Sequence, residues 1–162
     1  FFFNNNLNAK MKLEASIVKD YNYFKDLQIF LTIGQGDISL DNSSMKIKKI
    51  GLLKLNNSQI FILDNVLLLS GEFLVEVDNN VNFYKFFQTP KNYKKEIENI
   101  KINFDYNILL DELTINNFLI NDFKTGDALQ DVINSFNSRK NNFSNIVEFK
   151  NFFNKLMLNY DG

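Results

Sequence analysis

The sequence contains no cysteine, no histidine, no tryptophan and only one proline. Without cysteine the chain forms no disulfide bond and offers no thiolate as a nucleophile or zinc ligand. Without histidine it lacks the commonest metal ligand and the usual general base for a serine or threonine nucleophile. These absences exclude most hydrolytic and redox chemistry. We therefore predict a protein that is not an enzyme and uses no metal or other cofactor.

An excess of one charge is also missing, because 18 basic residues are balanced by 19 acidic ones. The lysines are scattered among acids, so we expect no nucleic-acid partner. Long hydrophobic runs are absent as well: stretches such as 60–63 and 66–69 are far shorter than the roughly 18 residues of a membrane-spanning helix. The sequence starts at Phe1 rather than Met. We interpret residues 1–10 as the ragged N-terminal end of a fragment.

What the sequence does have is an alternation of apolar and polar residues that recurs from residue 12 to about residue 120. An extended chain with this period has one apolar face. Asn, Asp and Gly separate the runs at intervals of roughly 7 to 15 residues, which favours antiparallel hairpins over parallel crossovers. The predicted strands are residues 11–18, 27–33, 37–40, 45–55, 59–63, 66–70, 72–77, 97–108 and 111–120.

The pattern breaks near Pro90 and becomes helical after residue 125. Residues 84–95 predict a turn or short helix that stops before Pro90, because the residue preceding proline is steered out of the helical region. From Leu129, apolar residues recur at i, i+3, i+4 and i+7, which predicts a helix over 127–139 with Asp127 as its N-cap. A second amphipathic helix is predicted over 145–162, with apolar residues on one stripe.

These patterns predict a mainly β fold: an elongated or curved antiparallel sheet of about nine strands with two C-terminal amphipathic helices. We assign residues 11–122 to the sheet and 123–162 to a helical region that packs on it. The alternating apolar residues should share one face, as core or as the lining of a groove. The residues predicted to line this face are Leu13, Ala15, Ile17, Ile29, Leu31, Ile33, Phe73, Val75, Val77, Ile100, Ile102 and Phe104.

Few polar residues form a pattern that indicates chemistry. The carboxylate pairs Asp37 with Asp41 and Asp111 with Glu112 have the ligand type of a hard cation site or an acid/base couple. They fall at predicted turns, however, where aspartate is common for backbone reasons. The segment 34–36, Gly-Gln-Gly, precedes a strand rather than a helix, so it predicts a hairpin and not a phosphate-binding loop.

Three segments repeat a unit of strand, glycine or polar turn, and strand. They are 31–40 (LTIGQGDISL), 45–51 (MKIKKIG) and 66–73 (VLLLSGEF), and residues 83–90 followed by 100–104 close the pattern. In this order the features resemble the C-terminal region of AsmA-like proteins, the bacterial envelope family that includes TamB and YhdP. The resemblance covers about residues 11 to 160.

The resemblance implies an elongated, taco-like sheet with an apolar concave side that conducts phospholipid across the periplasm during outer-membrane biogenesis. It implies phospholipid acyl chains as the partner and no catalytic residues. It also implies a bacterial periplasmic location, tethered to the inner membrane by an anchor upstream of this sequence. The residues alone also leave a cytoplasmic location open, because a chain without cysteine fits either compartment.

Two other functions are open at this point. The chain is a closed structural or protein-interaction module if the C-terminal helices seal the apolar face. It is a carbohydrate-binding domain if the acidic pairs act with aromatic platforms such as Tyr84. Because the apolar alternation is the dominant feature, we favour the lipid-guiding function.

Overall fold

The computed structural model describes residues 6–19, 22–124, 126–139 and 146–160. The helical elements are α1 (Asn80–Phe87), a short 3-10 turn η1 (Lys91–Tyr93), α2 (Asp127–Asn137) and α3 (Ile146–Leu158). The mainly β fold predicted from the sequence, with two C-terminal helices, is confirmed. The strands are β1 (Ala9–Ile17), β2 (Phe24–Gly34), β3 (Asp37–Ser39), β4 (Ser43–Ile47), β5 (Gly51–Leu63), β6 (Val66–Val77), β7 (Asn99–Asn107), β8 (Glu112–Ile120) and β9 (Phe123–Lys124).

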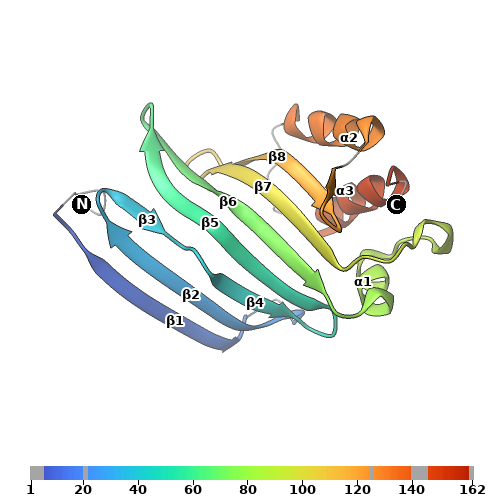
Figure 1. The fold of residues 1–162 in the computed structure, drawn as a ribbon, viewed down its shortest axis with the longest axis horizontal. Coiled ribbons are helices and arrows are strands. Elements are labelled where there is room, and N and C mark those ends of the chain that lie inside the picture. Colours follow the sequence, from blue (N-terminus) through green and yellow to red (C-terminus); the bar gives the residue numbers. More distant parts are fainter. Residues whose placement is uncertain (1–5, 20–21, 125, 140–145, 161–162) are drawn as a thin grey trace.

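The strands form one antiparallel sheet in which sequence neighbours are spatial neighbours (Figure 1). The order is β1-β2-β3-β5-β6-β7-β8-β9. Strands β3 and β4 lie one after the other between β2 and β5, because both pair with these two strands. Short turns or loops make most of these connections, whereas β6 and β7 are joined by the segment that contains α1 and η1. Residues 35–36 and 64–65 have positive φ at both central positions, as the predicted hairpins require.

The predicted strands 66–70 and 72–77 are in fact the single long strand β6. The predicted strand 45–55 covers the end of β4, a turn at 48–50 and the start of β5, which continues through the predicted strand 59–63. Residues 56–58 and 70–71 were expected to be hairpin corners, but β5 and β6 run through them. The register between β5 and β6 shifts between Asn56 and Gln59, which marks a bulge. The bulge packs on Gly71, where a Cβ atom would lie 2.9 Å from the Cβ of Ser58. Gly71 therefore serves close strand packing rather than a turn.

Helix α1 begins earlier than the sequence pattern indicated. Asn79, expected in a hairpin corner, is the N-cap, and its side chain accepts a hydrogen bond from the backbone N–H of Asn82. The helix ends at Gln88, which has a left-handed conformation (φ 60°), just before Pro90. The helix stops before Pro90, as predicted. Asn79 caps the helix, whereas the sequence pattern indicated a turn at this residue.

The predicted N-cap of α2, Asp127, lies one residue after the observed N-cap. Gly126 is the N-cap, and Asp127 lies in the first turn, where its carboxylate is favoured by the helix dipole. The predicted N-cap of α3 at Asn145 and the terminal Gly162 fall outside the described residues. Across the described part of the chain, the helices are too short or too polar to span a bilayer.

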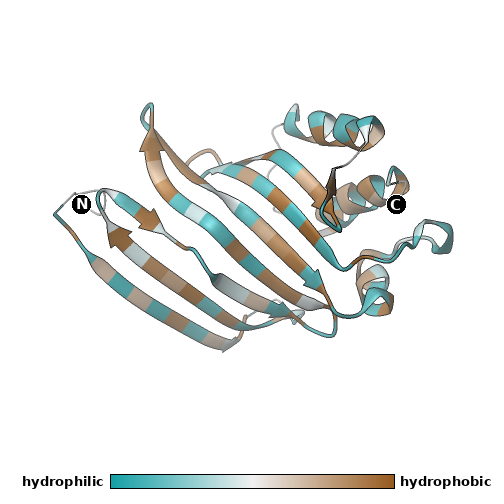
Figure 2. Ribbon diagram, viewed as in Figure 1, coloured by the Kyte–Doolittle hydropathy of each residue, from teal (hydrophilic) through white to brown (hydrophobic). Residues whose placement is uncertain are grey.

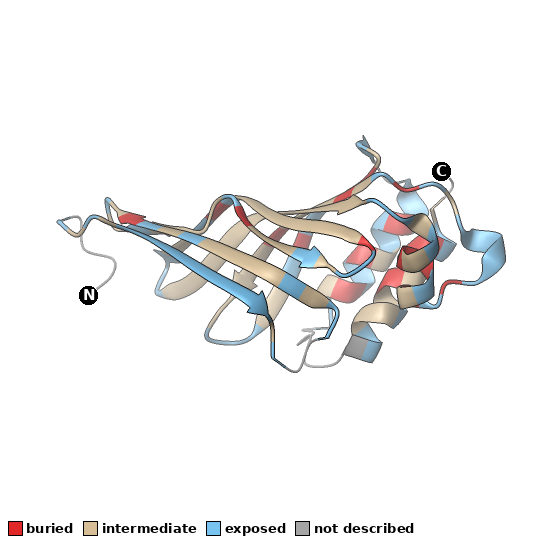
Figure 3. Ribbon diagram, turned by 90° about the horizontal axis from the view of Figure 1, so that it is seen from below, coloured by how far each residue is buried: buried red, intermediate tan, exposed pale blue. Residues whose placement is uncertain are grey.

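All three helices gather at one end of the curved sheet (Figures 1 and 3). This is the end where β6 and β8 finish and β7 begins. Buried residues concentrate there, whereas the N-terminal end of the sheet is largely exposed or half-buried (Figure 3). The core therefore joins the helices to one part of the sheet face and leaves another part uncovered.

Candidate functional site

One face of the sheet is apolar from strand to strand. Val75 pairs with Leu53 on one side and with Ile100 on the other, and Ile100 pairs in turn with Ile120. Directly paired residues point to the same face, and residues two apart along a strand do so as well. Figure 2 shows the resulting alternation of hydrophobic and hydrophilic residues along β7.

The same face continues to the N-terminal edge of the sheet. Gln28 pairs with Ser44 on the polar face, so their neighbours Ile29 and Met45 point to the apolar one. Ile29 pairs with Leu13 of β1. An apolar surface therefore runs without interruption from β8 to β1.

A cavity of about 260 Å³ lies between this face and the helices. The sheet forms one wall, and α1 and α3 form the other. Every lining residue is Phe, Ile, Leu or Val, so the cavity holds no ionisable group. The lining residues are Phe24, Ile47, Ile50, Leu53, Phe73, Val75, Phe83, Phe86, Phe87, Ile100, Ile102, Phe104, Leu113, Ile115, Phe118, Phe149, Phe152, Phe153 and Leu156.

Aromatic rings and two hydrogen bonds fix α3 against α1. The rings of Phe87 and Phe153 stack at 3.8 Å between centroids. The Nδ2 of Asn154 donates to the carbonyl oxygen of Phe87 at 2.7 Å, and its Oδ1 accepts from the hydroxyl of Thr89 at 2.7 Å. Asn154 thus satisfies the carbonyl end of α1, which would otherwise lack a partner inside the helix.

A single amide also fixes α2 against the sheet. The Nδ2 of Asn137 donates to the carbonyl oxygen of Ile115 at 2.8 Å, and its Oδ1 accepts from the Ile115 N–H at 2.9 Å. The strand is bulged next to this point, between Asn103 and Phe104 of the partner strand. The end of α2 therefore provides hydrogen-bond partners for the N–H and C=O groups of Ile115, in place of a neighbouring strand.

Beyond the cavity the apolar face is open. Met11 is 48% exposed and Leu13 is 55% exposed, both on β1, and Ile62 at the far end of β5 is 55% exposed. The pairing of Ile62 with Leu67 places it on the same face as Phe73. These exposed side chains and the covered cavity are parts of one surface.

The structure brings five of the residues predicted from alternation together around the cavity: Phe73, Val75, Ile100, Ile102 and Phe104. Ile100 and Phe104 are fully buried, Val75 and Ile102 are half-buried against the core, and the half-buried Phe73 stacks on Phe104.

The remaining predicted residues lie outside the cavity. Val77 packs at the edge of the core, Ile33 is buried near the N-terminal end, and Ile29 and Leu31 are half-buried. Sequence reasoning placed Leu13, Ala15 and Ile17 with the lining, but all three are exposed because no described helix covers β1. Leu13 and Ala15 belong to the open part of the face. Ile17 pairs with Lys25, which pairs with Lys46 on the polar face beyond a bulge in β2, so Ile17 is not part of the apolar face.

Sequence reasoning predicted that the apolar stripe of the second C-terminal helix, which includes Phe149 and Phe152 of α3, packs on the sheet, but it did not name these residues as cavity lining. It missed Phe83, Phe86 and Phe87 of α1, which complete this wall of the cavity. Their i, i+3 and i+4 spacing is the signal of an apolar helix face. The spacing reveals that these residues are buried, but it does not reveal which sheet residues they cover.

The charged groups with perturbed pKa values lie away from the cavity. A hydrogen-bonded ion pair raises the pKa of Lys101 and lowers the pKa of Asp122. Lys46, 3.0 Å away, likewise lowers the pKa of Asp26. Lys101 points to the face opposite its neighbour Ile100. The charges therefore mark the solvated side of the sheet.

Each acidic pair that the sequence offered for sugar or metal binding has one member with a structural role. Asp41 accepts a hydrogen bond from the backbone N–H of Asn57 at 2.6 Å, and Asp111 accepts one from the hydroxyl of Tyr106. Tyr84 is only 3% exposed and is not a surface platform. Within the described ranges, no cluster of three or more acidic residues suited to a metal ion occurs.

Comparison of the chain with protein-family models gave no match. Comparison with curated proteins and with solved structures also gave none. The apolar face and its cavity are therefore the guide to function.

Proposed function

We propose that this chain is a non-enzymatic segment that shields the acyl chains of phospholipid in its apolar β groove. The observation that carries the proposal is the continuity between a dry cavity under the helices and the exposed apolar side chains of β1 and β5. An apolar surface of this extent on a water-soluble protein is a mark of a binding site. An alkyl chain suits it because each buried CH₂ group contributes about 0.8 kcal/mol without any polar contact.

The cavity volume fits part of an alkyl chain. A dry apolar cavity of about 150 Å³ holds one benzene molecule, so about 260 Å³ holds on the order of ten carbon atoms. The acyl chain of a membrane lipid is longer than that. The rest of the chain would lie along the open face toward Leu13, where it covers side chains that are otherwise in water.

The resemblance to AsmA-like proteins extends the proposal to a cellular role. In that role the chain guides phospholipid between the inner and outer membranes of a bacterium, in the periplasm, as part of outer-membrane biogenesis. The curved antiparallel sheet and the absence of ionisable groups from the cavity are consistent with it. The resemblance also extends the proposal to a tether that holds the protein at the inner membrane.

Displacement of a fluorescent fatty acid tests the proposal. In Leu13→Glu a charge enters the open apolar face, and we expect the affinity for the probe to fall at least tenfold because a carboxylate resists burial against an alkyl chain. The matched control is Ser16→Glu, an exposed residue of the same strand on the opposite face. Equal affinity in the two variants, or no binding by the wild-type chain, would contradict the proposal.

A closed protein-interaction module is the second candidate, and the edge strand β1 favours it. β1 pairs only with β2 in the described structure, so its other edge presents unpaired backbone groups. Lys10, Lys12 and Glu14 place charges along this strand, which is how natural edge strands resist pairing. Because of these charges we rank lipid shielding first.

A further inference from the structure

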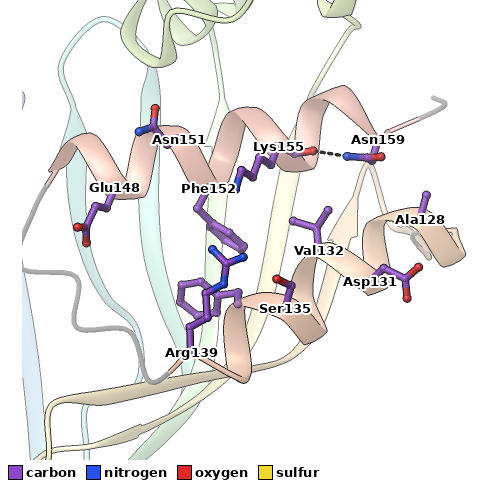
Figure 4. Close-up of a pocket in the computed structure, with 11 residues that line it drawn as sticks. Ala128, Asp131, Val132, Ser135, Arg139, Glu148, Asn151, Phe152, Lys155 and Asn159 are labelled. Carbon is purple, nitrogen blue, oxygen red and sulfur yellow. Dashed lines mark hydrogen bonds between the residues drawn. The ribbon is translucent and has the colours of Figure 1, made fainter.

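A second cleft, of about 610 Å³, lies between α2 and α3. Its lining combines polar and charged side chains with apolar ones such as Val132 and Phe152, unlike the wholly apolar cavity under the sheet. Arg139, just past α2, and Lys155 of α3 extend from opposite sides toward Phe152 (Figure 4). The carboxylates of Asp131 and Glu148 lie farther out, toward the two ends of the cleft (Figure 4). The centre of the cleft is therefore positively charged.

Arg139 and Lys155 are both exposed, and neither forms an ion pair with a described residue. The ion pairs of the described chain lie on the sheet and its turns, at Lys12, Lys46 and Lys54 and at the Lys101–Asp122 pair. A guanidinium presents a planar fork that matches a phosphate or carboxylate, and an ammonium adds a point charge. The two cations thus form a receptor for one anion.

Phe152 connects this cleft with the apolar cavity, because it lines both. Its ring packs against Phe136 at 4.4 Å between centroids, which holds it between the two spaces. Phe152 therefore marks where the polar cleft and the apolar cavity adjoin.

We propose that the α2–α3 cleft binds the anionic headgroup of the amphiphile whose alkyl chain enters the cavity. This inference rests on the proposed function and adds to it a selectivity for the headgroup. Arg139 and Lys155 contact the phosphate or carboxylate, while Phe152 marks the boundary between head and chain. The acids at the ends of the cleft balance the two cations, so the site favours a headgroup of low net charge.

The test measures binding of three amphiphiles of equal chain length to the full 162-residue chain by isothermal titration calorimetry. They are a lysophospholipid with a phosphodiester head, a fatty acid and an uncharged monoacylglycerol. In the double variant Arg139→Gln/Lys155→Gln we expect at least tenfold weaker binding of the anionic amphiphile, because charge-assisted hydrogen bonds are lost. Binding of monoacylglycerol should change less than twofold.

The control is Lys48→Gln/Lys91→Gln, which removes the same charge at two exposed turns. Equal weakening by both double variants, or equal losses for anionic and uncharged amphiphiles, would overturn the headgroup site. Binding of all three amphiphiles to the wild-type chain with equal affinity would overturn it too, while leaving the lipid groove intact. Failure of every amphiphile to bind would instead remove the proposed function. Tighter binding of the lysophospholipid or of the fatty acid identifies the source of the anion.

Discussion

At the scale of single residues, Tyr84 shows how a buried polar group is accommodated beside the apolar core. Its hydroxyl donates to the carbonyl oxygen of Lys95 at 2.6 Å and accepts from the Lys95 N–H at 2.9 Å. One side chain therefore satisfies both backbone groups of a residue in the loop that follows α1. Burial raises the pKa of Tyr84 above its ordinary value of 10.0, because the ionised form is poorly solvated there.

This raised pKa predicts a loss of stability at alkaline pH. Below pH 10 the hydroxyl keeps its proton in both states. Between the ordinary and the raised pKa only the unfolded chain loses the proton, so the free energy of unfolding falls as the pH rises through that window. We expect Tyr84→Phe to cost about 1–2 kcal/mol at pH 7 through the lost hydrogen bonds, and to flatten the alkaline fall.

Urea unfolding between pH 8 and 11.5 measures both effects. The comparison is with the wild-type chain, whose other tyrosines titrate in both proteins and cancel. Parallel curves for the two proteins above pH 10 would show that Tyr84 ionises as readily in the folded state as in the unfolded one.

At the scale of elements, the helices stabilise the sheet through a few fully buried side chains. Leu156 of α3 is 0% exposed and lines the cavity, whereas Leu158 two residues later is 44% exposed. We expect Leu156→Ala to lower the free energy of unfolding by about 2–5 kcal/mol and Leu158→Ala by less than about 1 kcal/mol. Chemical unfolding followed by circular dichroism measures the difference, and similar losses in the two variants would mean that α3 does not cover the sheet as described.

The elements also show what could be predicted from the sequence. Alternation is a local property with a period of two, so the strands and the shared face of Val75 and Ile100 followed from it directly. The bulge at residues 56–58 could not be told from a turn, because Asn and Gly are typical of both. Its identity depends on Ser58 packing on Gly71 of the next strand, which is a tertiary contact.

Coverage of the face is the part of the candidate site that alternation could not predict. Leu13 and Ile100 occupy equivalent positions in strands of similar pattern, yet one is exposed and the other buried. The difference arises from where α1 and α3 pack, and an amphipathic stripe does not specify its partner. The sequence therefore predicted the surface but not the boundary between its closed and open parts.

At the scale of the whole molecule, the protein is a curved sheet with one end of its apolar face covered by helices and the other end open (Figures 1 and 3). In a fully sealed module, Met11, Leu13 and Ile62 would not be expected to be exposed to water on the face that forms the core. The asymmetry is expected if an alkyl chain occupies the cavity and continues along the open part of the face.

Native mass spectrometry of the chain, purified from bacterial membranes in mild conditions, tests this most directly. We predict that the wild-type chain carries phospholipid and that Leu13→Glu carries much less, while Ser16→Glu on the opposite face carries as much as wild type. The opposite result is a folded wild-type chain that carries no lipid. Its mass would then differ from that of each variant only by the substitution, and this would contradict the account.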